Sequence, residues 1–346
     1  MRVIPIEEAE PRMKLAKPIY RVNDGRILLQ AGLELTELYI EKLKHLKYTH
    51  IAVQEIEDKV EILNYETIKE ATRNRAAVYL KNAIRQVQGN QSISVEKLKQ
   101  VVREVIDQVL ADSQVVYNLI QMRVYDKYLY NHSINVCIIS LLVGMSLGLF
   151  KSELESLGTG ALLHDIGKLI ITEKILNKKE KLNPREYEVV KQHARHGYEI
   201  LKTKANLSFL MAHVALQHHE REDGSGYPKG LSGNNIHRFA KIAAVADVFD
   251  AMTTRRPFQN EVPAYIAIKE IRDNHRKFDP MVIQHFIKVV APYPIGSVLL
   301  LNNGQNVAVT SIARDHCLVK VTNGPHEGKT YNLFQSSELK VIAQIR

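Results

Sequence analysis

Apolar residues recur with helical spacing through the middle of the chain, and this pattern is densest over residues 126–290. The longest apolar stretch, residues 133–150, carries no charged side chain and approaches the shortest length that can cross a membrane. It also contains Asn135, several serines and two glycines, so we expect a fully buried core helix in a protein without a membrane span. The pattern therefore predicts a bundle of helices over residues 126–290.

The regions on the N-terminal side of this bundle predict different structures. Residues 1–64 read as a small α+β domain: a turn signal at 23–25 precedes the apolar run 27–29, a strand is expected at 50–53, and Thr36 can cap a helix ending near residue 46. Residues 65–125 are polar and contain almost no glycine or proline, which predicts a helical linker.

Within this linker, Gly89, Asn90 and Gln91 predict a break between two helices, and Ser94 can cap the second one. The second helix presents an apolar stripe, which consists of Val101, Val102, Ile106, Val109 and Leu110. Packing inside the chain is the simpler interpretation of the stripe. A helical pair that forms a homodimer, or that relays a signal to other proteins, is the alternative.

The last segment, residues 291–346, changes character at Pro294 and Gly296. Its hairpin signals, at residues 303–304 and 323–324, are Asn-Gly pairs flanked by runs of Val, Leu and Ile. They predict a small C-terminal β appendage. The chain as a whole is therefore expected to be mainly α-helical, with a small domain on each side of the bundle.

Composition narrows the function only slightly. The 346 residues are 45% hydrophobic and 25% charged, which excludes disordered and collagen-like chains. A net charge of +9 favours acidic partners such as nucleotides, nucleic acid or a membrane surface, and selects none of them. Cys137 and Cys317 are the only cysteines, so neither a disulfide framework nor a thiolate zinc ribbon is expected. The low cysteine count fits a reducing compartment, and glutamates at positions 7, 8 and 10 interrupt any signal peptide. These two features predict a cytoplasmic protein.

The candidate chemistry lies in the histidines and aspartates of the bundle, several of which interrupt apolar helices. An unpaired imidazole or carboxylate is costly in such surroundings. Five imidazoles and two carboxylates stand out, and they are His132, His164, Asp165, His193, His218, His219 and Asp247. Because neighbouring helical residues point about 100° apart, one member of the pair at 164–165 can bind one metal while the other reaches between two.

Each of these residues has an ordinary explanation when it is taken alone. His132 is then a core histidine with satisfied hydrogen bonds, the pair at 164–165 closes a helix end, and Asp247 forms a salt bridge with one of the arginines at 255–256. Taken together, the set suits two divalent metals bridged by Asp165. Imidazole-rich ligation without thiolates favours iron, manganese, nickel or zinc over magnesium or calcium. Two metals about 3.5–4 Å apart can activate a bridging hydroxide for in-line attack on phosphorus.

The motifs around these residues resemble a known family. The His164-Asp165 pair with its flanking histidines is similar to the HD phosphohydrolase superfamily. The run His218-His219-Glu220 followed by Asp-Gly-Ser-Gly-Tyr-Pro at 223–228 resembles the signature of its HD-GYP family, and the likeness extends over roughly residues 115–290. Members of that family are bacterial helical bundles, and their usual activity is hydrolysis of cyclic di-GMP.

The resemblance implies a role for each matching residue. The seven residues above would hold two divalent transition metals, with iron or manganese expected, and a bridging hydroxide would cut cyclic di-GMP to pGpG, GMP or both. Lys168 would contact the scissile phosphate and assist the leaving oxygen. Arg256 would bind substrate, and Gly226, Tyr227 and Pro228 would form the loop that gives the family its name.

Two positions depart from the pattern of the family. Some members have a glutamate one helical turn before the first histidine and hold a third metal; Tyr128 stands there in this chain, so a two-metal site is expected. Some members also have a lysine three residues after the substrate arginine, and Gln259 replaces it here. One phosphate contact of the family is therefore not expected in this chain.

Three other functions compete with this one. The pocket could bind a cyclic dinucleotide and signal with little turnover, or act on mononucleotides or alarmones; the glycine-rich loop argues against the latter. Binding of a nucleic acid polymer is suggested by net charge alone. Charge runs such as residues 178–181 are usually solvated surfaces, and no DNA- or RNA-binding signature is present.

Overall fold

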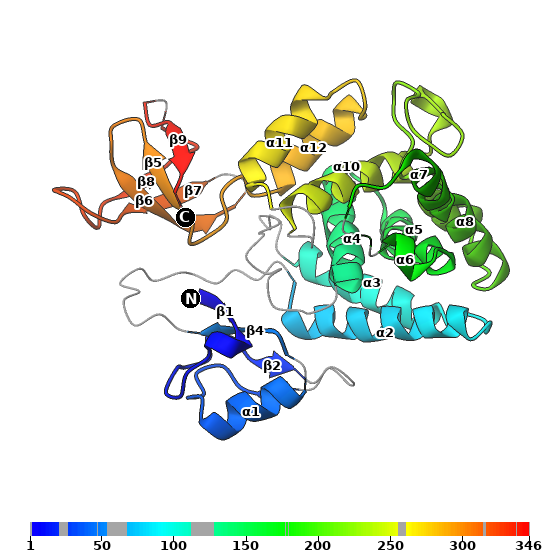
Figure 1. Ribbon diagram of the computed structural model, residues 1–346. Coiled ribbons are helices and arrows are strands. Elements are labelled where there is room, and N and C mark those ends of the chain that lie inside the picture. Colours follow the sequence, from blue (N-terminus) through cyan, green and yellow to red (C-terminus); the bar gives the residue numbers. More distant parts are fainter. Residues whose placement is uncertain are drawn as a thin grey trace. The chain divides into compact units, whose positions relative to one another are not determined.

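The computed structural model describes residues 2–20, 27–46, 48–53, 68–111, 128–176, 178, 180–254, 261–313, 316–336 and 338–345. The chain divides into two compact units. The first comprises Met1–Val78, Asn118–Asn131 and Tyr293–Arg346, and the second comprises Tyr79–Tyr117 and His132–Pro292. Figure 1 shows the helices of the bundle in cyan to yellow and the C-terminal strands in orange to red.

The N-terminal part of the first unit is α+β, as predicted. Strand β1 (Arg2–Pro5) pairs antiparallel with β4 (His50–Val53), and β2 (Ile19–Tyr20) pairs with β3 (Ile27–Leu29). A short 3-10 helix, η1 (Ile6–Glu8), follows β1. Helix α1 (Glu37–His45) begins at Thr36, whose hydroxyl accepts a hydrogen bond from the Tyr39 amide at 3.3 Å and thus confirms the predicted cap. The turn signal at 23–25 lies outside the described residues.

The C-terminal part of the first unit is a five-stranded antiparallel sheet in the order β8-β7-β6-β5-β9. Its strands are β5 (Val298–Leu301), β6 (Asn306–Ile312), β7 (Cys317–Val321), β8 (Thr330–Asn332) and β9 (Val341–Gln344). Both hairpin predictions are confirmed, because β5 pairs with β6 and β7 pairs with β8 across the two Asn-Gly turns. Gly304 and Gly324 adopt φ angles of 80° and 90°, which glycine reaches without steric cost.

The second unit is a helical bundle, so the mainly α fold class is confirmed. Its helices, with the 3-10 segments, are α2 (Glu70–Gln88, which begins in the first unit), α3 (Glu96–Leu110), α4 (Tyr128–Ser146), α5 (Lys151–Leu162), η3 (Ile166–Ile170), α6 (Glu173–Leu176), α7 (Pro184–Lys191), α8 (His193–Thr203), α9 (Phe209–Gln217), η4 (Gly233–Asn235), α10 (Arg238–Thr253), α11 (Ala264–Asp273) and α12 (Pro280–Val289). Helix α9 lies against α5, α8 and α10, and α8 also packs on η3.

Helix α4 confirms the prediction of a buried core helix. Val136, Ile138, Leu141 and Leu142 have no accessible surface although they point in different directions around the helix. A helix that is apolar all round is stable only when protein surrounds it. In the part of the chain that the structure describes, no helix combines the length and the apolar character that a membrane crossing needs.

Two details of the linker were predicted wrongly. Ser94 does not cap α3: the residue before the helix is Val95, and the Ser94 amide instead donates to Gln86 Oε1 at 3.2 Å, which closes the turn between α2 and α3. Leu110, the last residue of α3, is 56% exposed and lies outside the buried apolar stripe. The other four members of the stripe are buried within the chain.

An arginine fork joins α3 to α5. Arg103 donates from Nε and Nη2 to the two oxygens of Glu155, at 2.8 and 3.0 Å, and from Nη1 to Glu96 at 3.0 Å. The hydrogen bonds from Arg103 lower the pKa of Glu155 below its ordinary value, although partial burial acts in the opposite direction. The fork therefore favours the folded state whenever Glu155 is ionised.

We expect Glu155→Gln to lower the thermal denaturation temperature at neutral pH. Because the pKa of Glu155 is lower in the folded state, its contribution is fully present above the unfolded pKa and disappears as the pH falls through the folded pKa. Differential scanning calorimetry from pH 7 down to pH 3 should show the two proteins converging in acid. Glu199→Gln, at an exposed position on α8, is the control. A difference that persists unchanged at pH 3 would contradict this account.

Candidate metal centre

The structure brings all seven predicted ligands together inside the second unit. His132 comes from α4, His193 from the first turn of α8, and Asp247 from α10. His164 and Asp165 occupy the turn between α5 and η3, and His218 and His219 end α9. The ligand atoms form two groups, each within 4.8 Å, and the groups are Asp165, His193, His218 and His219, and His132, His164 and Asp247.

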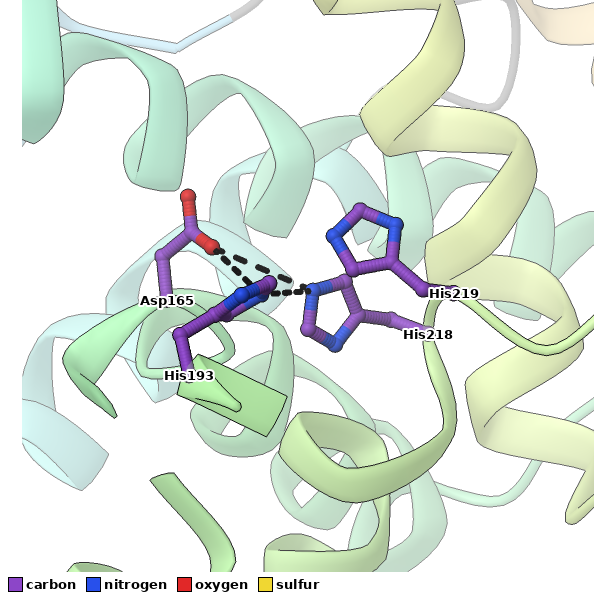
Figure 2. Close-up of side chains that lie close together, drawn as sticks. All are labelled: Asp165, His193, His218 and His219. Atoms are coloured by element: carbon purple, nitrogen blue, oxygen red, sulfur yellow. Dashed lines mark hydrogen bonds and ion pairs between the residues drawn. The ribbon is translucent and has the colours of Figure 1, made fainter. Parts of the chain in front are cut away.

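Asp165 lies between these groups and presents one carboxylate oxygen to each. Its Oδ1 is 3.5 Å from His193 Nε2 and 3.9 Å from His218 Nε2, as Figure 2 shows. Its Oδ2 is 3.4 Å from His164 Nε2 and 3.6 Å from His132 Nε2. This arrangement is the one that a carboxylate needs to bridge two cations.

Main-chain carbonyls fix the orientation of three of the imidazoles. The Nδ1 atoms of His164, His193 and His218 lie 2.7, 2.6 and 2.9 Å from the carbonyl oxygens of Ala161, Val190 and Ala215. A carbonyl only accepts, so each Nδ1 carries a proton, and each ring turns its Nε2 atom toward Asp165.

Among the described residues, the hydrogen bonds of the protein leave part of this cluster of Nε2 atoms and carboxylate oxygens unsatisfied. His193 Nε2 and His218 Nε2 are 3.3 Å apart, and both face a carboxylate. His164 Nε2 and Asp165 Oδ1 are buried without any hydrogen bond. Acceptors that converge in this way repel one another and carry the desolvation cost of unpaired polar groups. The donor set therefore fits divalent cations, which satisfy imidazole nitrogen and carboxylate oxygen together.

The protonation states agree with this reading. Burial lowers the pKa of His193, and lowers the pKa of His218 and His219 well below the usual value, so these rings are neutral. Burial would raise the pKa of Asp165 and Asp247, but Lys168 beside Asp165 and the hydrogen bond from His132 to Asp247 outweigh it, so the pKa of both lies well below the ordinary range. Neutral imidazole and ionised carboxylate are the forms that bind metal.

His132 is the exception, because carboxylates lie on both sides of its ring. Its Nδ1 is 2.6 Å from Asp250 Oδ2, and its Nε2 is 3.2 Å from Asp247 Oδ1. Burial lowers the pKa of His132, but the hydrogen bonds to Asp247 and Asp250 outweigh burial and raise it to about 9. Asp247 therefore forms an ion pair with His132. The predicted alternative was a salt bridge to one of the arginines at 255–256, which lie outside the described residues.

Close backbone packing holds the turn that carries Asp165. At Gly167, an added Cβ would lie 2.0 Å from the carbonyl oxygen of His193 and 2.4 Å from the amide of Gly197. Only glycine lets η3 approach the first turn of α8 this closely. The packing brings Asp165 and His193 together, although 28 residues separate them in the sequence.

The loop after His219 is held by a buried carboxylate. Glu220 accepts hydrogen bonds from the amides of Lys229 and Leu231 at 2.8 and 2.9 Å. A Cβ at Gly226 would lie 2.5 Å from the main chain of residues 219–221, so the loop folds tightly back on the histidine pair. The Tyr227 ring stacks on the His219 ring at 4.6 Å, and Pro228 follows it. The predicted loop residues thus lie beside the metal ligands.

A cavity of about 260 Å³ opens next to this centre. Its polar lining is Lys168, His219, Arg221 and Asp247, and its apolar lining is Val248, Ala251 and Met252 of α10. Lys168 donates from Nζ to Asp165 Oδ2 and keeps 27% of its side chain exposed. Arg256 and Gln259 lie outside the described residues.

Sequence reasoning overlooked three residues of this site. Asp250 and Glu220 were given no role, although a second carboxylate one turn after Asp247 was a usable signal. Arg221 gave no signal, because an arginine between two glutamates usually pairs with them.

Comparisons with known proteins agree with this geometry. The sequence model of the HD domain matches residues 114–282. The cyclic di-GMP phosphodiesterase PA4108 of Pseudomonas aeruginosa is 34% identical over 67% of this chain and 56% of its own length. The cyclic di-GMP phosphodiesterase of Thermotoga maritima is 39% identical over 47% of this chain and 45% of its own length. The chain belongs to the HD-GYP family.

Two further comparisons, one of sequence and one of structure, extend the likeness of this HD-GYP chain to known proteins. The 3′3′-cGAMP-specific phosphodiesterase 3 of Vibrio cholerae is 36% identical over 44% of this chain and 33% of its own length. The solved structure of Bd1817, an HD-GYP-type protein of Bdellovibrio bacteriovorus, has a TM-score of 0.56 and 18% identity, and it covers 82% of this chain and 97% of its own. The latter shows a common fold. This HD-GYP chain spans about half the length of the curated relatives it matches.

We expect Asp250→Asn to weaken metal binding by roughly ten- to a hundredfold, because a neutral amide holds His132 less firmly than a carboxylate does. Titration with Mn²⁺, followed by calorimetry, measures this affinity. Asp273→Asn, at an exposed position near the end of α11, serves as the control. Equal affinities of the Asp250 variant and the unmodified HD-GYP chain would contradict the role of Asp250.

Proposed function

We propose that this chain is a metal-dependent phosphodiesterase that hydrolyses cyclic di-GMP to pGpG, GMP or both. The observation that carries the proposal is Asp165, whose two buried oxygens face different imidazole nitrogens. Seven ligands in two groups suit a pair of divalent transition metals, and iron or manganese suits their imidazole-rich character. The named activities of the relatives support the same substrate class.

Each side chain of the site has a distinct part in this proposal. Bound metals would supply Lewis acidity and an activated water nucleophile at neutral pH. Asp165 would hold both metals, and the remaining ligands would be His132, His164, His193, His218, His219 and Asp247. The main-chain hydrogen bonds of the histidines keep their Nε2 atoms directed inward, so little reorganisation precedes the reaction.

Lys168 is the proposed acid of the reaction. Its ammonium group lines the cavity and lies against Asp165, beside the place where a scissile phosphodiester would meet the metals. There it would offset the charge that builds on the phosphoryl oxygens and give a proton to the departing 3′ oxygen. Tyr227, with Gly226 and Pro228, would line the substrate path, and Arg256 would add a second cationic contact.

The remaining regions are proposed to serve this domain. We assign the phosphohydrolase domain to residues 126–290, with residues 1–64 and 291–346 as accessory domains and 65–125 as a linker. We place the protein in the cytoplasm, where cyclic dinucleotides and reduced thiols occur; Cys137 and Cys317 are both buried and unpaired.

The proposed activity is tested with protein purified without oxygen, loaded with Mn²⁺ or Fe²⁺ and incubated with cyclic di-GMP or 3′3′-cGAMP. Chromatography should show pGpG or GMP from cyclic di-GMP, and Asp165→Ala should lower turnover at least about a hundredfold because no side chain then joins the two groups. Asp107→Ala, which removes an exposed ion pair with Lys151, is the control. Absence of products from the metal-replete chain, or turnover that survives in the Asp165 variant, would refute the proposal.

We also expect Lys168→Met to lower kcat for cyclic di-GMP roughly a hundredfold while the metal content stays the same. The loss should be smaller for bis(p-nitrophenyl) phosphate, because p-nitrophenolate leaves without being protonated. Lys174→Met, at an exposed position on α6, is the matched control. Equal losses on both substrates would remove the role of Lys168 as the acid.

A further inference from the structure

Arg221 stands in an acidic segment, yet each neighbouring carboxylate has another partner. Glu220 binds the amides of Lys229 and Leu231, and Glu222 forms an ion pair with Lys241 at 2.7 Å. Asp223 accepts from the amide of Ser225 at 3.0 Å. Within the described ranges, no carboxylate lies at ion-pair distance from the Arg221 guanidinium.

The guanidinium is nevertheless held in place. Its Nη1 donates to the carbonyl oxygens of His218 and Glu220, at 3.1 and 2.9 Å. The group lies over the Phe278 ring, 5.3 Å from its centroid. One nitrogen therefore fixes the side chain, while Nε and Nη2 retain donors for a ligand. An immobilised cation without a counter-ion is prepared to bind an anion, because little side-chain entropy is lost when it does so.

The position of Arg221 identifies the anion it would meet. Arg221 lines the same cavity as Lys168, His219 and Asp247, and α10 closes the cavity with an apolar wall, Val248, Ala251 and Met252. A cyclic dinucleotide carries two phosphodiesters on opposite sides of its ring and a purine on each nucleotide. When one phosphodiester occupies the metal centre, the other remains in a partly enclosed cavity and needs a cationic partner.

We infer that Arg221 binds the second, uncut phosphodiester of a cyclic dinucleotide, with a purine against the wall of α10. This inference rests on the proposed function and adds a residue that determines specificity for a substrate with two phosphates. Arginine suits the role, since its forked donors match two phosphate oxygens at once. A substrate with a single phosphodiester makes no such contact.

The test compares cyclic di-GMP with bis(p-nitrophenyl) phosphate, which has one phosphodiester. We expect Arg221→Gln to lower kcat/KM for cyclic di-GMP at least tenfold more than kcat/KM for the small ester, mainly through KM. Arg221→Lys should recover only part of this loss, because an ammonium group lacks the fork. Arg238→Gln, on the first turn of α10 and outside the lining of the cavity, is the matched control. Metal content is measured for every variant.

Each outcome decides the matter. If both substrates lose activity equally and the metal content falls, Arg221 only supports the His218 main chain, and the inference is wrong. If Arg221→Gln leaves the ratio of the two kcat/KM values unchanged while the metal content stays full, Arg221 does not contact the second phosphate. If the unmodified chain cleaves the small ester but no cyclic dinucleotide, the proposed function fails first and the inference fails with it.

Discussion

The carboxylate of Asp165 is the constraint on which the rest of the site depends. It is 4% exposed, and imidazole nitrogens face both of its oxygens. A buried carboxylate normally draws hydrogen bonds from donors, but here three rings have committed their protons to main-chain carbonyls and present lone pairs instead. Lys168 supplies one positive charge at Oδ2. Divalent cations would satisfy the remaining carboxylate oxygen and the imidazole nitrogens together.

The scaffold keeps this costly arrangement in place by backbone contact. Gly167 has no Cβ, so the backbone of η3 can lie directly against the backbone of α8, and α9 packs against both α8 and α5. Three of the histidines follow helix C-termini, where main-chain carbonyls are free to accept a hydrogen bond from Nδ1. Rigid elements around the site reduce the reorganisation that metal binding and phosphoryl transfer would otherwise need.

The cavity beside the ligands has two kinds of surface. Lys168 and Arg221 supply positive charge, while α10 contributes the apolar side chains of Val248, Ala251 and Met252. Substrates that combine phosphate with a flat aromatic base match both surfaces. These two surfaces are the physical basis of the proposed nucleotide substrate, and the cationic edge suits a ligand with more than one phosphate.

The sequence by itself determined the helical bundle, the flanking α+β and β regions and the seven histidines and aspartates that the structure brings together. These follow from local causes: apolar spacing, an Asn-Gly turn, and polar residues placed where apolar ones are expected. It was wrong about Ser94 and Leu110, because the end of a helix depends on the turn and the neighbours that it packs against. Only the tertiary structure decided that Asp250 orients His132 and that Arg221 has no carboxylate at ion-pair distance among the described residues, since partner choice among nearby charges depends on distances in space.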